Sequence, residues 1–200
     1  MKTLIIAVVG ASGSGKSTVV AQLMAESALQ ISVVQVDHYY RELDHLTLHE
    51  RNRVNFDHPD AIEFERLCED LKTLRRGESI HAPIYDFTVH NRARETQRVE
   101  ATDFVIVEGI LALADSEAAA LVDKVVFIDT SLAICLARRI ARDVSERGRT
   151  EESVRDFWET RAAPMFSEFV APWKAKADLV LSGEGDPSVT YKRLTSWLRK

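Results

Sequence analysis

The stretch that most constrains the fold of this chain is a glycine-rich loop close to its start. The loop reads Gly10-Ala11-Ser12-Gly13-Ser14-Gly15-Lys16-Ser17-Thr18 and directly follows the apolar run Leu4–Val9. It fits the pattern G-x-x-x-x-G-K-[ST], in which a strand turns through a glycine loop into a helix. Glycines allow several backbone N–H groups to point into one concavity, next to the positive end of the helix dipole. The sequence therefore predicts a strand, a loop and a helix that together bind a polyphosphate.

Two side chains at the end of this loop have separate expected roles. We expect Lys16 to reach the β and γ phosphates of a nucleotide, and the Ser17 hydroxyl to ligate a Mg²⁺ ion that bridges them. The alternative is a flexible loop of small residues without a chemical role, which the preceding strand disfavours. The expected phosphate-binding positions are Gly10, Ser12, Gly13, Ser14, Gly15, Lys16, Ser17 and Thr18.

Composition narrows the classes of function. A chain of 200 residues with 46% hydrophobic content can bury one sizeable core, so we expect one domain over residues 1–200. The formal charge of −5 argues against nucleic acid as a partner. Cys68 and Cys135 lack metal-ligand spacing and are expected to be reduced core thiols. Because the apolar runs are too short for a signal peptide or a membrane span, we expect a cytoplasmic protein without a membrane partner.

Apolar runs of strand length alternate with helical patterns along the chain. Runs that are apolar on both faces predict a parallel sheet of about five strands with helices on each side, the α/β fold of P-loop NTPases. In such sheets ligands bind beyond the carboxyl ends of the strands. The five runs are Leu4–Val9, Ile31–Val36, Phe104–Val107, Val125–Ile128 and Leu179–Leu181.

Two of these expected strands are followed by an acidic side chain. Asp37 comes after the second run, where a carboxylate near the phosphate loop can accept a proton from a hydroxyl that attacks the γ phosphate. A turn cap is an equally good interpretation of a single Asp at a strand exit. Glu108 comes after Phe104–Val107, where P-loop proteins place an acid in the Mg²⁺ shell.

A helix and a hairpin are predicted between residues 60 and 100. The helix has Asp60 as its N-cap, ends at Gly77, and presents an inner stripe to the core. Asp57 precedes it and either binds a ligand or stabilises the turn. The inner stripe consists of Phe64, Leu67, Cys68, Leu71 and Leu74.

The hairpin is expected to be inserted in the helical layer. Residues 83–88 form its first strand, 89–94 its turn and 95–99 its second strand. The side chains of Tyr85, Phe87 and His90 suit a clamp for a flat ring. Ordinary cross-strand aromatic pairs are the commoner use of such residues.

The helix from Ser131 carries an unusual charge pattern. Its apolar stripe is Leu132, Cys135, Leu136, Ile140 and Val144, and its arginines continue into the following turn as Arg138, Arg139, Arg142, Arg147 and Arg149, against the acids Asp143 and Glu146. Such a run is usually a solvated face. We favour a lid over about residues 138–160, because phosphoryl transfer places guanidinium groups on developing charge and Gly148 allows a bend.

The remaining helices are predicted from apolar spacing. Residues 151–173 carry an apolar stripe that we expect in the core, interrupted at Pro164. Asp186-Pro187 opens a last helix whose inner side is expected to be Val189, Leu194, Trp197 and Leu198. The stretch Leu181–Gly185 looks like part of a transporter ATPase signature, but it follows the acidic strand instead of preceding it, so we assign it no function.

Taken in order, these stretches resemble the uridine kinases, also called uridine–cytidine kinases. The similarity covers nearly the whole chain. Beyond the phosphate loop it includes Asp37-x-Tyr39-Tyr40, Asn55-Phe56-Asp57-His58-Pro59, Pro83-Ile84-Tyr85-Asp86-Phe87 with His90, Glu108-Gly109-Ile110, Arg138-Arg139, Arg142-Asp143 and Ser145-Glu146-Arg147-Gly148-Arg149.

The resemblance implies transfer of the γ phosphate of ATP or GTP to the 5′-hydroxyl of uridine or cytidine, with Mg²⁺. It implies that Asp37 is the base, with Lys16 as the second catalytic residue, that Ser17 and Glu108 hold the metal, and that residues 38–100 contain the substrate-binding insertion. It also implies a homotetramer with feedback by CTP or UTP. The implied nucleoside-binding residues are Tyr40, Phe56, Asp57, Tyr85, Phe87, His90, Arg139 and Arg149, and those gripping phosphates are Arg142 and Arg147.

The chain departs from the family pattern at one place. Phe157-Trp158 stands where the family usually has Gln followed by Tyr, so an apolar ring replaces an amide that could touch the substrate or fix the lid.

Two other functions are alternatives to a nucleoside kinase. A related kinase of another small alcohol, such as phosphoribulokinase or pantothenate kinase, would share the phosphate machinery without the aromatic hairpin. A nucleotide-dependent switch is disfavoured, because Lys176 and Asp178 lack the preceding Asn of N-K-x-D and because Asp37 is a candidate base.

Overall fold

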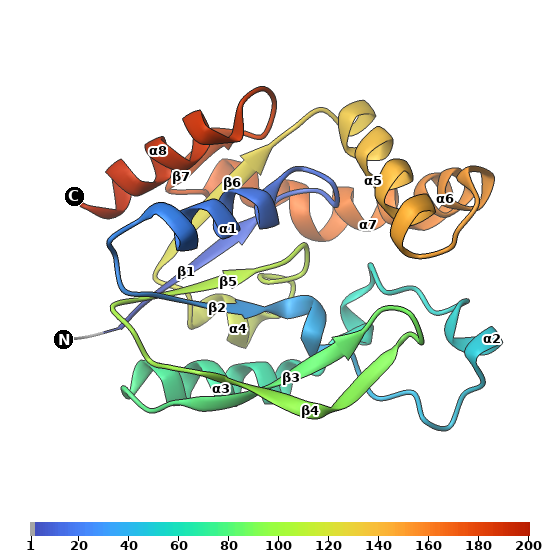
Figure 1. Ribbon diagram of the computed structural model, residues 1–200, viewed down its shortest axis with the longest axis horizontal. Coiled ribbons are helices and arrows are strands. Elements are labelled where there is room, and N and C mark those ends of the chain that lie inside the picture. Colours follow the sequence, from blue (N-terminus) through green and yellow to red (C-terminus); the bar gives the residue numbers. More distant parts are fainter. Residues whose placement is uncertain (1–2) are drawn as a thin grey trace.

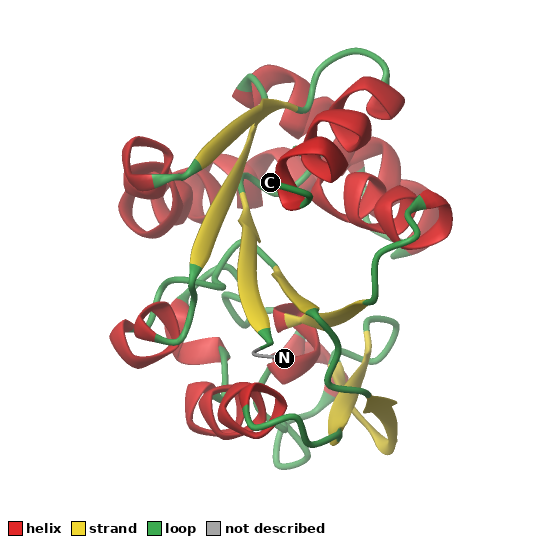
Figure 2. Ribbon diagram, turned by 90° about the vertical axis from the view of Figure 1, so that its left-hand side faces the viewer, coloured by secondary structure: helices red, strands yellow, loops and turns green. Residues whose placement is uncertain are grey.

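The computed structural model describes residues 3–200, and its centre is a parallel sheet of five strands in the order β2-β5-β1-β6-β7 (Figure 1). Helices cover both faces of this sheet (Figure 2). Each predicted apolar run forms one of the strands, which confirms the predicted fold class. The bounds are β1 Leu4–Val9, β2 Ile31–Gln35, β5 Phe104–Glu108, β6 Lys124–Asp129 and β7 Leu179–Ser182.

Strand β1 lies in the middle of the sheet and is buried on both faces. Ile6 and Val8 pack on the side covered by α1 and α8, while Ile5, Ala7 and Val9 pack on the side of α3. This alternation follows from the two-residue period of a strand, and it explains why the run is apolar throughout. The helices are α1 Lys16–Glu26, α2 Leu48–Arg51, α3 Phe64–Arg75, α4 Ser116–Ala120, α5 Leu132–Glu146, α6 Glu151–Phe157, α7 Ala163–Met165 and α8 Pro187–Leu198.

The glycine loop joins β1 to α1 as predicted. Gly13 has a φ of 83° and Gly15, which precedes the first residue of α1, has a φ of 98°. A Cβ on Gly13 would also overlap the carbonyl oxygen of Cys135 in α5. Both backbone conformation and space therefore require glycine at position 13.

Strands β3 (Ile80–Asp86) and β4 (Asn91–Val99) form the predicted hairpin beside α3 and the β2 edge of the sheet (Figure 1). Its turn is shorter than the predicted 89–94, because residues 91–94 already belong to β4. Two features fix the turn there. His90 adopts a left-handed φ of 49°, and the buried Asn91 side chain accepts a hydrogen bond from Leu43 N and donates one to Asp44.

Helix α3 begins later than predicted, and Asp60 is not its N-cap. Residues 59–61 form a 3₁₀ turn, and Glu63 stands at the N-cap position. The delay has a tertiary cause: Ile62 pairs with Tyr40 in a short antiparallel bridge, and Glu63 N donates to Tyr39 O. Of the predicted inner stripe, Leu67, Cys68, Leu71 and Leu74 are buried, while Phe64 is only partly buried against the same core.

Pro164 does not interrupt the helical segment that contains it. Helix α6 continues through a π-helical turn at Trp158–Ala162, the short α7, and a second π-helical turn at Phe166–Val170. In the wider turns N–H groups bond five residues back, as Ala163 N does to Trp158 O, and this accommodates the missing N–H of proline. Phe157 was predicted in the core, but it lines a cavity instead.

Two apolar faces differ from their predictions. On α5, Val144 is 45% exposed and Leu132 is also exposed, while the buried positions are Cys135, Arg139 and Asp143. On α8, Val189 is 58% exposed and Thr190 faces inward, where its hydroxyl donates to Ser182 O. Within residues 3–200, no helix is both long enough and apolar enough to cross a membrane.

Candidate active site

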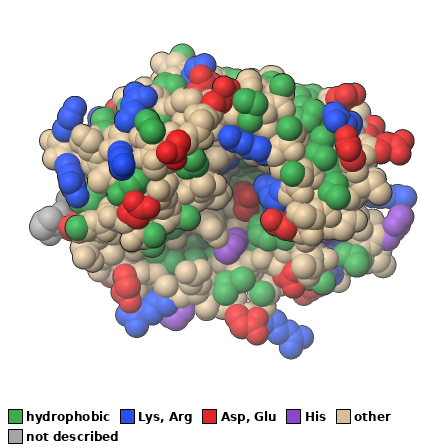
Figure 3. Space-filling view, turned by 45° about the horizontal axis from the view of Figure 1, so that its top comes forward, with side chains coloured by type: hydrophobic (Ala, Val, Ile, Leu, Met, Phe, Trp, Pro, Cys, Tyr) green, Lys and Arg blue, Asp and Glu red, His purple; other side chains and the backbone are tan. Residues whose placement is uncertain are grey.

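Two cavities meet beyond the carboxyl ends of the strands. The first, of about 400 Å³, lies on the glycine loop, and the second, of about 450 Å³, lies between the hairpin and helices α5 and α6. Ser12, Asp37, Ile110 and Arg142 line both. The surface is hollowed on this side, with Lys and Arg side chains around the hollow and acidic and His side chains within it (Figure 3).

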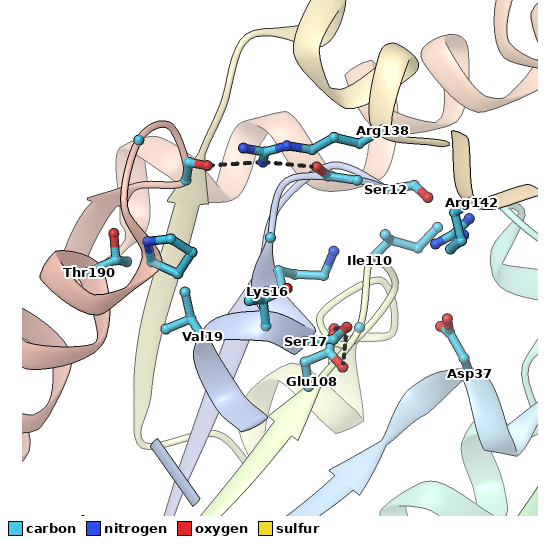
Figure 4. A pocket seen from close by; sticks show the side chains of 17 residues that line it. Ser12, Lys16, Ser17, Val19, Asp37, Glu108, Ile110, Arg138, Arg142 and Thr190 are labelled. Carbon is cyan, nitrogen blue, oxygen red and sulfur yellow. Dashed lines mark hydrogen bonds between the residues drawn. The ribbon is translucent and has the colours of Figure 1, made fainter. Parts of the chain in front are cut away.

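The side chain of Lys16 is buried at the base of the first cavity (Figure 4). Its Nζ donates to the carbonyl oxygens of Gly10, at 3.1 Å, and Ala11, at 3.0 Å. Burial lowers the pKa of Lys16, and the nearby carboxylates of Glu108 and Asp37 oppose that shift. A phosphate in this cavity would give the ammonium group a charged partner in place of two carbonyls.

Ser17 and Glu108 form the part of the cavity that fits a divalent cation. The Ser17 hydroxyl lies 3.2 Å from each carboxylate oxygen of Glu108 (Figure 4). Burial raises the pKa of Glu108, with Lys16 opposing. No group of three His, Cys, Asp or Glu side chains suited to a metal exists among residues 3–200. Mg²⁺ needs no such group, because it takes one or two protein oxygens together with phosphates and water.

Asp37 lies in a 3₁₀ turn directly after β2, where the two cavities join. Burial raises the pKa of Asp37, and Lys16 is the strongest opposing charge. None of the described residues forms a hydrogen bond with its carboxylate, so the interpretation as a turn cap fails. A partly buried carboxylate without a hydrogen-bond donor, next to a phosphate cavity, can accept a proton from a bound hydroxyl.

The second cavity is lined by aromatic rings from three segments. Tyr40 makes edge contacts with Phe56 and Tyr85, with ring centroids 4.9 and 5.0 Å apart. His90 stacks on Phe56 at 5.3 Å and 15°, and Phe87 contacts Tyr85. His90 holds the left-handed position in the hairpin turn, and it lines this second cavity. Burial, followed by the charges of Arg147 and Arg149, lowers the pKa of His90, which favours a neutral imidazole.

Asp57 and Arg139 face one another in the same cavity. Arg139 Nη2 donates to Asp57 Oδ2 at 3.0 Å, and Nη1 donates to Oδ1 at 3.3 Å. Both side chains are about nine-tenths buried. The Asp57 carboxylate caps no turn in the part of the chain that the structure describes, because Arg139 is its only hydrogen-bond donor there.

Arginines of α5 and of the turn that follows it line the two cavities. Arg142 lines both cavities, while Arg147 and Arg149 line the second. The Arg147 guanidinium lies over the ring of Phe87, 4.6 Å from its centroid, so the arginine segment contacts the tip of the hairpin. The predicted site residues thus line one or both cavities, except Gly10 and Ser14, of which Ser14 is fully buried; Arg147, predicted to grip phosphates, lines only the second cavity.

Three contributions differ from what the sequence predicted. Asp143 is buried among the arginines. Phe157 was expected in the core, although the resemblance has an amide at its position that could touch the substrate, and its ring lies beneath Arg139 and Arg149. The third is Gly183, in the stretch that we had assigned no function: its carbonyl accepts a hydrogen bond from Arg138, and a Cβ there would overlap Ser14 O. The segment after β7 therefore closes the first cavity. A glycine directly after the last strand was the available signal.

Proteins with similar sequences over nearly the whole chain are uridine kinases. A uridine kinase of Macrococcus caseolyticus is 40% identical over 196 residues, covering 98% of this chain and 95% of the relative. A uridine kinase of Clostridium novyi is 39% identical over 201 residues, covering 100% and 97%. One of Aliivibrio fischeri is 42% identical over 187 residues, covering 91% and 87%.

Solved structures share the fold at low identity. The phosphoribulokinase from Rhodobacter spheroides superimposes with a TM-score of 0.69 at 18% identity, covering 90% of this chain and 70% of that one. D-glycerate 3-kinase from Cryptococcus neoformans gives 0.62 at 17% identity, covering 92% and 88%. The sequence model of the Phosphoribulokinase / Uridine kinase family matches residues 5–189. The family model covers most of the chain, and the site contains the phosphate loop with Glu108 beside it. The chain therefore belongs to the phosphoribulokinase/uridine kinase family.

Proposed function

We propose that this chain is a nucleoside kinase, which transfers the γ phosphate of ATP or GTP to the 5′-hydroxyl of uridine or cytidine. One observation carries the proposal: Asp37 lies between a phosphate-binding cavity and a cavity lined by aromatic rings. The relatives at about 40% identity over nearly the whole chain are uridine kinases, which supports the same substrate class.

The donor nucleotide would occupy the first cavity. Backbone N–H groups of the glycine loop and the Lys16 ammonium would bind its β and γ phosphates, and Arg142 and Arg147 would reach them from above. Ser17 and Glu108 would hold Mg²⁺, which supplies positive charge to the phosphate oxygens when bound. The arginine segment, about residues 138–160, would act as the lid.

The acceptor nucleoside would occupy the second cavity. Asp57 would accept hydrogen bonds from the ribose 2′ and 3′ hydroxyls, and Arg139 would donate to them. The rings of Tyr40, Phe56, Tyr85 and Phe87 would enclose the base, whose edge would meet His90 and Arg149. A neutral imidazole either donates or accepts according to its tautomer, so one pocket can suit both uracil and cytosine.

Asp37 would accept the proton of the 5′-hydroxyl as that oxygen attacks the γ phosphate. Its raised pKa makes it a better proton acceptor than an exposed Asp, provided that it is ionised. Lys16 would have two functions here: it would neutralise charge on the transferred phosphate, and it opposes the rise in the pKa of Asp37 that burial causes.

Three further proposals concern the location, assembly and inhibition of the protein. We propose a cytoplasmic location, supported by the two buried cysteines, which are free. We also propose the homotetramer and the inhibition by CTP or UTP that the resemblance implies. Size-exclusion chromatography with light scattering and an inhibition assay test these two statements.

A coupled assay for ADP release tests the function. Release should depend on uridine or cytidine and should stay at background with ribulose 5-phosphate or pantothenate. Turnover with either of those alcohols, but not with nucleosides, would favour the alternative of a related small-alcohol kinase. Release without any acceptor would favour a nucleotide-dependent switch.

A further inference from the structure

Asp143 of α5 lies at the centre of the densest charge cluster of the site. Its side chain is 1% exposed, although the residue has no role in the reaction described above. Four arginines approach its carboxylate within 4.0 Å: Arg142 Nη2 at 2.8 Å, Arg139 Nε at 3.6 Å, Arg149 Nη1 at 3.6 Å and Arg147 Nε at 3.8 Å.

The backbone of Asp143 also shapes the turn after α5. Its carbonyl oxygen accepts hydrogen bonds from Arg147 N and Arg149 N, each at 3.2 Å. The side chain donates nothing and accepts a close hydrogen bond from Arg142 Nε at 2.9 Å. Its second oxygen, Oδ2, has no hydrogen bond among residues 3–200, so Arg139 and Arg149 are held there by charge at longer range.

The carboxylate offsets a repulsion that the cluster cannot otherwise avoid. Guanidinium groups stay charged under all relevant conditions, and four of them around one buried point repel each other. Arg139 has a second acid, Asp57, but Asp143 is the only acid that pairs with Arg142, Arg147 or Arg149 among the described residues. Removal of one partner from a buried charge group is costly because the remaining charges stay buried.

We propose that Asp143 is a positioning residue, which serves as the shared counter-ion of the four arginines until donor phosphates bind Arg142. This deepens the proposed function, on which it rests for the assignment of the two cavities. Arg139, Arg147 and Arg149 line only the nucleoside cavity, whereas Arg142 reaches both cavities. When phosphates draw Arg142 away, the full charge of Asp143 acts on the other three arginines. Phosphate binding therefore orders the nucleoside site.

The variant Asp143→Asn tests this, because it keeps the shape and removes the charge. Tripolyphosphate with MgCl₂ probes the first cavity and uridine probes the second, each by isothermal titration calorimetry. We expect tripolyphosphate to bind roughly threefold to tenfold more tightly to the variant, because a negative charge near the anion is gone. We expect uridine to bind at least about fivefold more weakly, and the tightening of uridine by tripolyphosphate in the wild type to disappear.

Glu146→Gln is the matched control. Glu146 is exposed on the same helix and has no ion pair with any of the described residues. The substitution therefore removes the same charge as Asp143→Asn without removing an ion pair of the arginine cluster. Its two dissociation constants should stay within about twofold of the wild type. The expected changes in affinity have opposite directions at the two cavities. A residue that only stabilised the fold would instead weaken the binding of both ligands when it is replaced.

Each remaining outcome is decisive. Equal weakening of both ligands in Asp143→Asn, or an unchanged effect of tripolyphosphate on uridine, would overturn the proposal. If the variant is unfolded in buffer, the proposal requires tripolyphosphate to restore its thermal transition, and failure to do so counts against it. A wild type that binds tripolyphosphate but no nucleoside would refute the proposed function, while the tripolyphosphate comparison still decides the role of Asp143.

Discussion

The Asp57 carboxylate and the Arg139 guanidinium form a two-bonded pair across 82 residues of sequence, with N–O distances of 3.0 and 3.3 Å. The pair joins the loop before α3 to the middle of α5. Because both groups are buried, a ligand hydroxyl that reaches them meets charged partners that water does not fully solvate. Hydrogen bonds to charged groups contribute about 1.5–3 kcal/mol each.

The first prediction concerns ribose selection by this pair. Deoxyuridine should be a poorer substrate than uridine by roughly tenfold to a hundredfold in kcat/KM, because the missing 2′-hydroxyl leaves a charged group without its partner. Asp57→Ala should move that ratio toward one, chiefly by lowering activity on uridine. Steady-state kinetics with both nucleosides on both proteins measures it. An unchanged ratio in a folded variant would exclude Asp57 from ribose recognition.

The second prediction concerns Asp37 as the base. Asp37→Asn keeps the shape and cannot accept the proton, so kcat should fall by about 10²–10⁴ while the affinity for uridine changes little. In the wild type, kcat/KM should fall toward acid with a midpoint above the ordinary range of Asp, because burial raises the pKa of Asp37. A variant with near wild-type turnover would remove Asp37 from the mechanism.

The same substitution should stabilise the protein at neutral pH. Burial raises the pKa of Asp37 on folding, so the folded protein binds this proton more tightly than the unfolded chain does. An ionised Asp37 therefore costs folding free energy above that raised pKa, and the cost disappears as the pH falls through it. Asp37→Asn should raise Tm at pH 7, and the gain should shrink at acidic pH. A lower Tm at pH 7 would contradict this account.

The third prediction separates Lys16 from Ser17. Lys16→Ala should abolish measurable turnover, because it removes the buried charge at the β and γ phosphates. Ser17→Ala should mainly raise the Mg²⁺ concentration needed for half-maximal rate, since its hydroxyl lies at hydrogen-bond distance from Glu108, the other proposed Mg²⁺ ligand. Titration of Mg²⁺ at saturating ATP measures this. Full activity of either variant would mean that the loop does not bind the donor as proposed.

The fourth prediction concerns Phe157, whose ring lies 5.1 Å from the Arg139 guanidinium carbon and 5.0 Å from that of Arg149. Cation–π contacts contribute about 0.5–2 kcal/mol each, depending on burial. Phe157→Leu removes the aromatic face and should raise the KM for uridine roughly threefold to tenfold, with the KM for ATP nearly unchanged. Phe157→Tyr keeps the face and is the control. Equal effects of both variants on uridine would show that the ring only fills space.

Part of this site could be read in consecutive residues. The order of residues 10–18 sets the glycine loop, because backbone freedom at glycine and the charge of a nearby lysine are local properties. The five apolar runs became five parallel strands for a similar reason: a buried strand needs apolar residues on both faces. Asp37 and Glu108 were found because strand ends are visible in sequence and parallel strands end at one edge of the sheet.

Other parts depended on which elements face one another. Helical spacing marked Val144 as buried, but the fold buries Asp143 beside it, because four arginines from a helix and its turn converge on that carboxylate. Spacing also marked Phe157 as core, yet the arginines of a second helix place its ring against the nucleoside cavity. The late start of α3 arose from the bridge between Ile62 and Tyr40.

The sequence by itself therefore determined the backbone scaffold and the phosphate loop of this protein, because local conformation and hydrophobic period are encoded in neighbouring residues. Only the tertiary structure decided the partners of its buried charges. Burial of a charge is stable only when an opposite charge arrives from elsewhere in the chain, as with Asp57 and Arg139. Such a pairing is a property of packed elements, and no spacing along the chain records it.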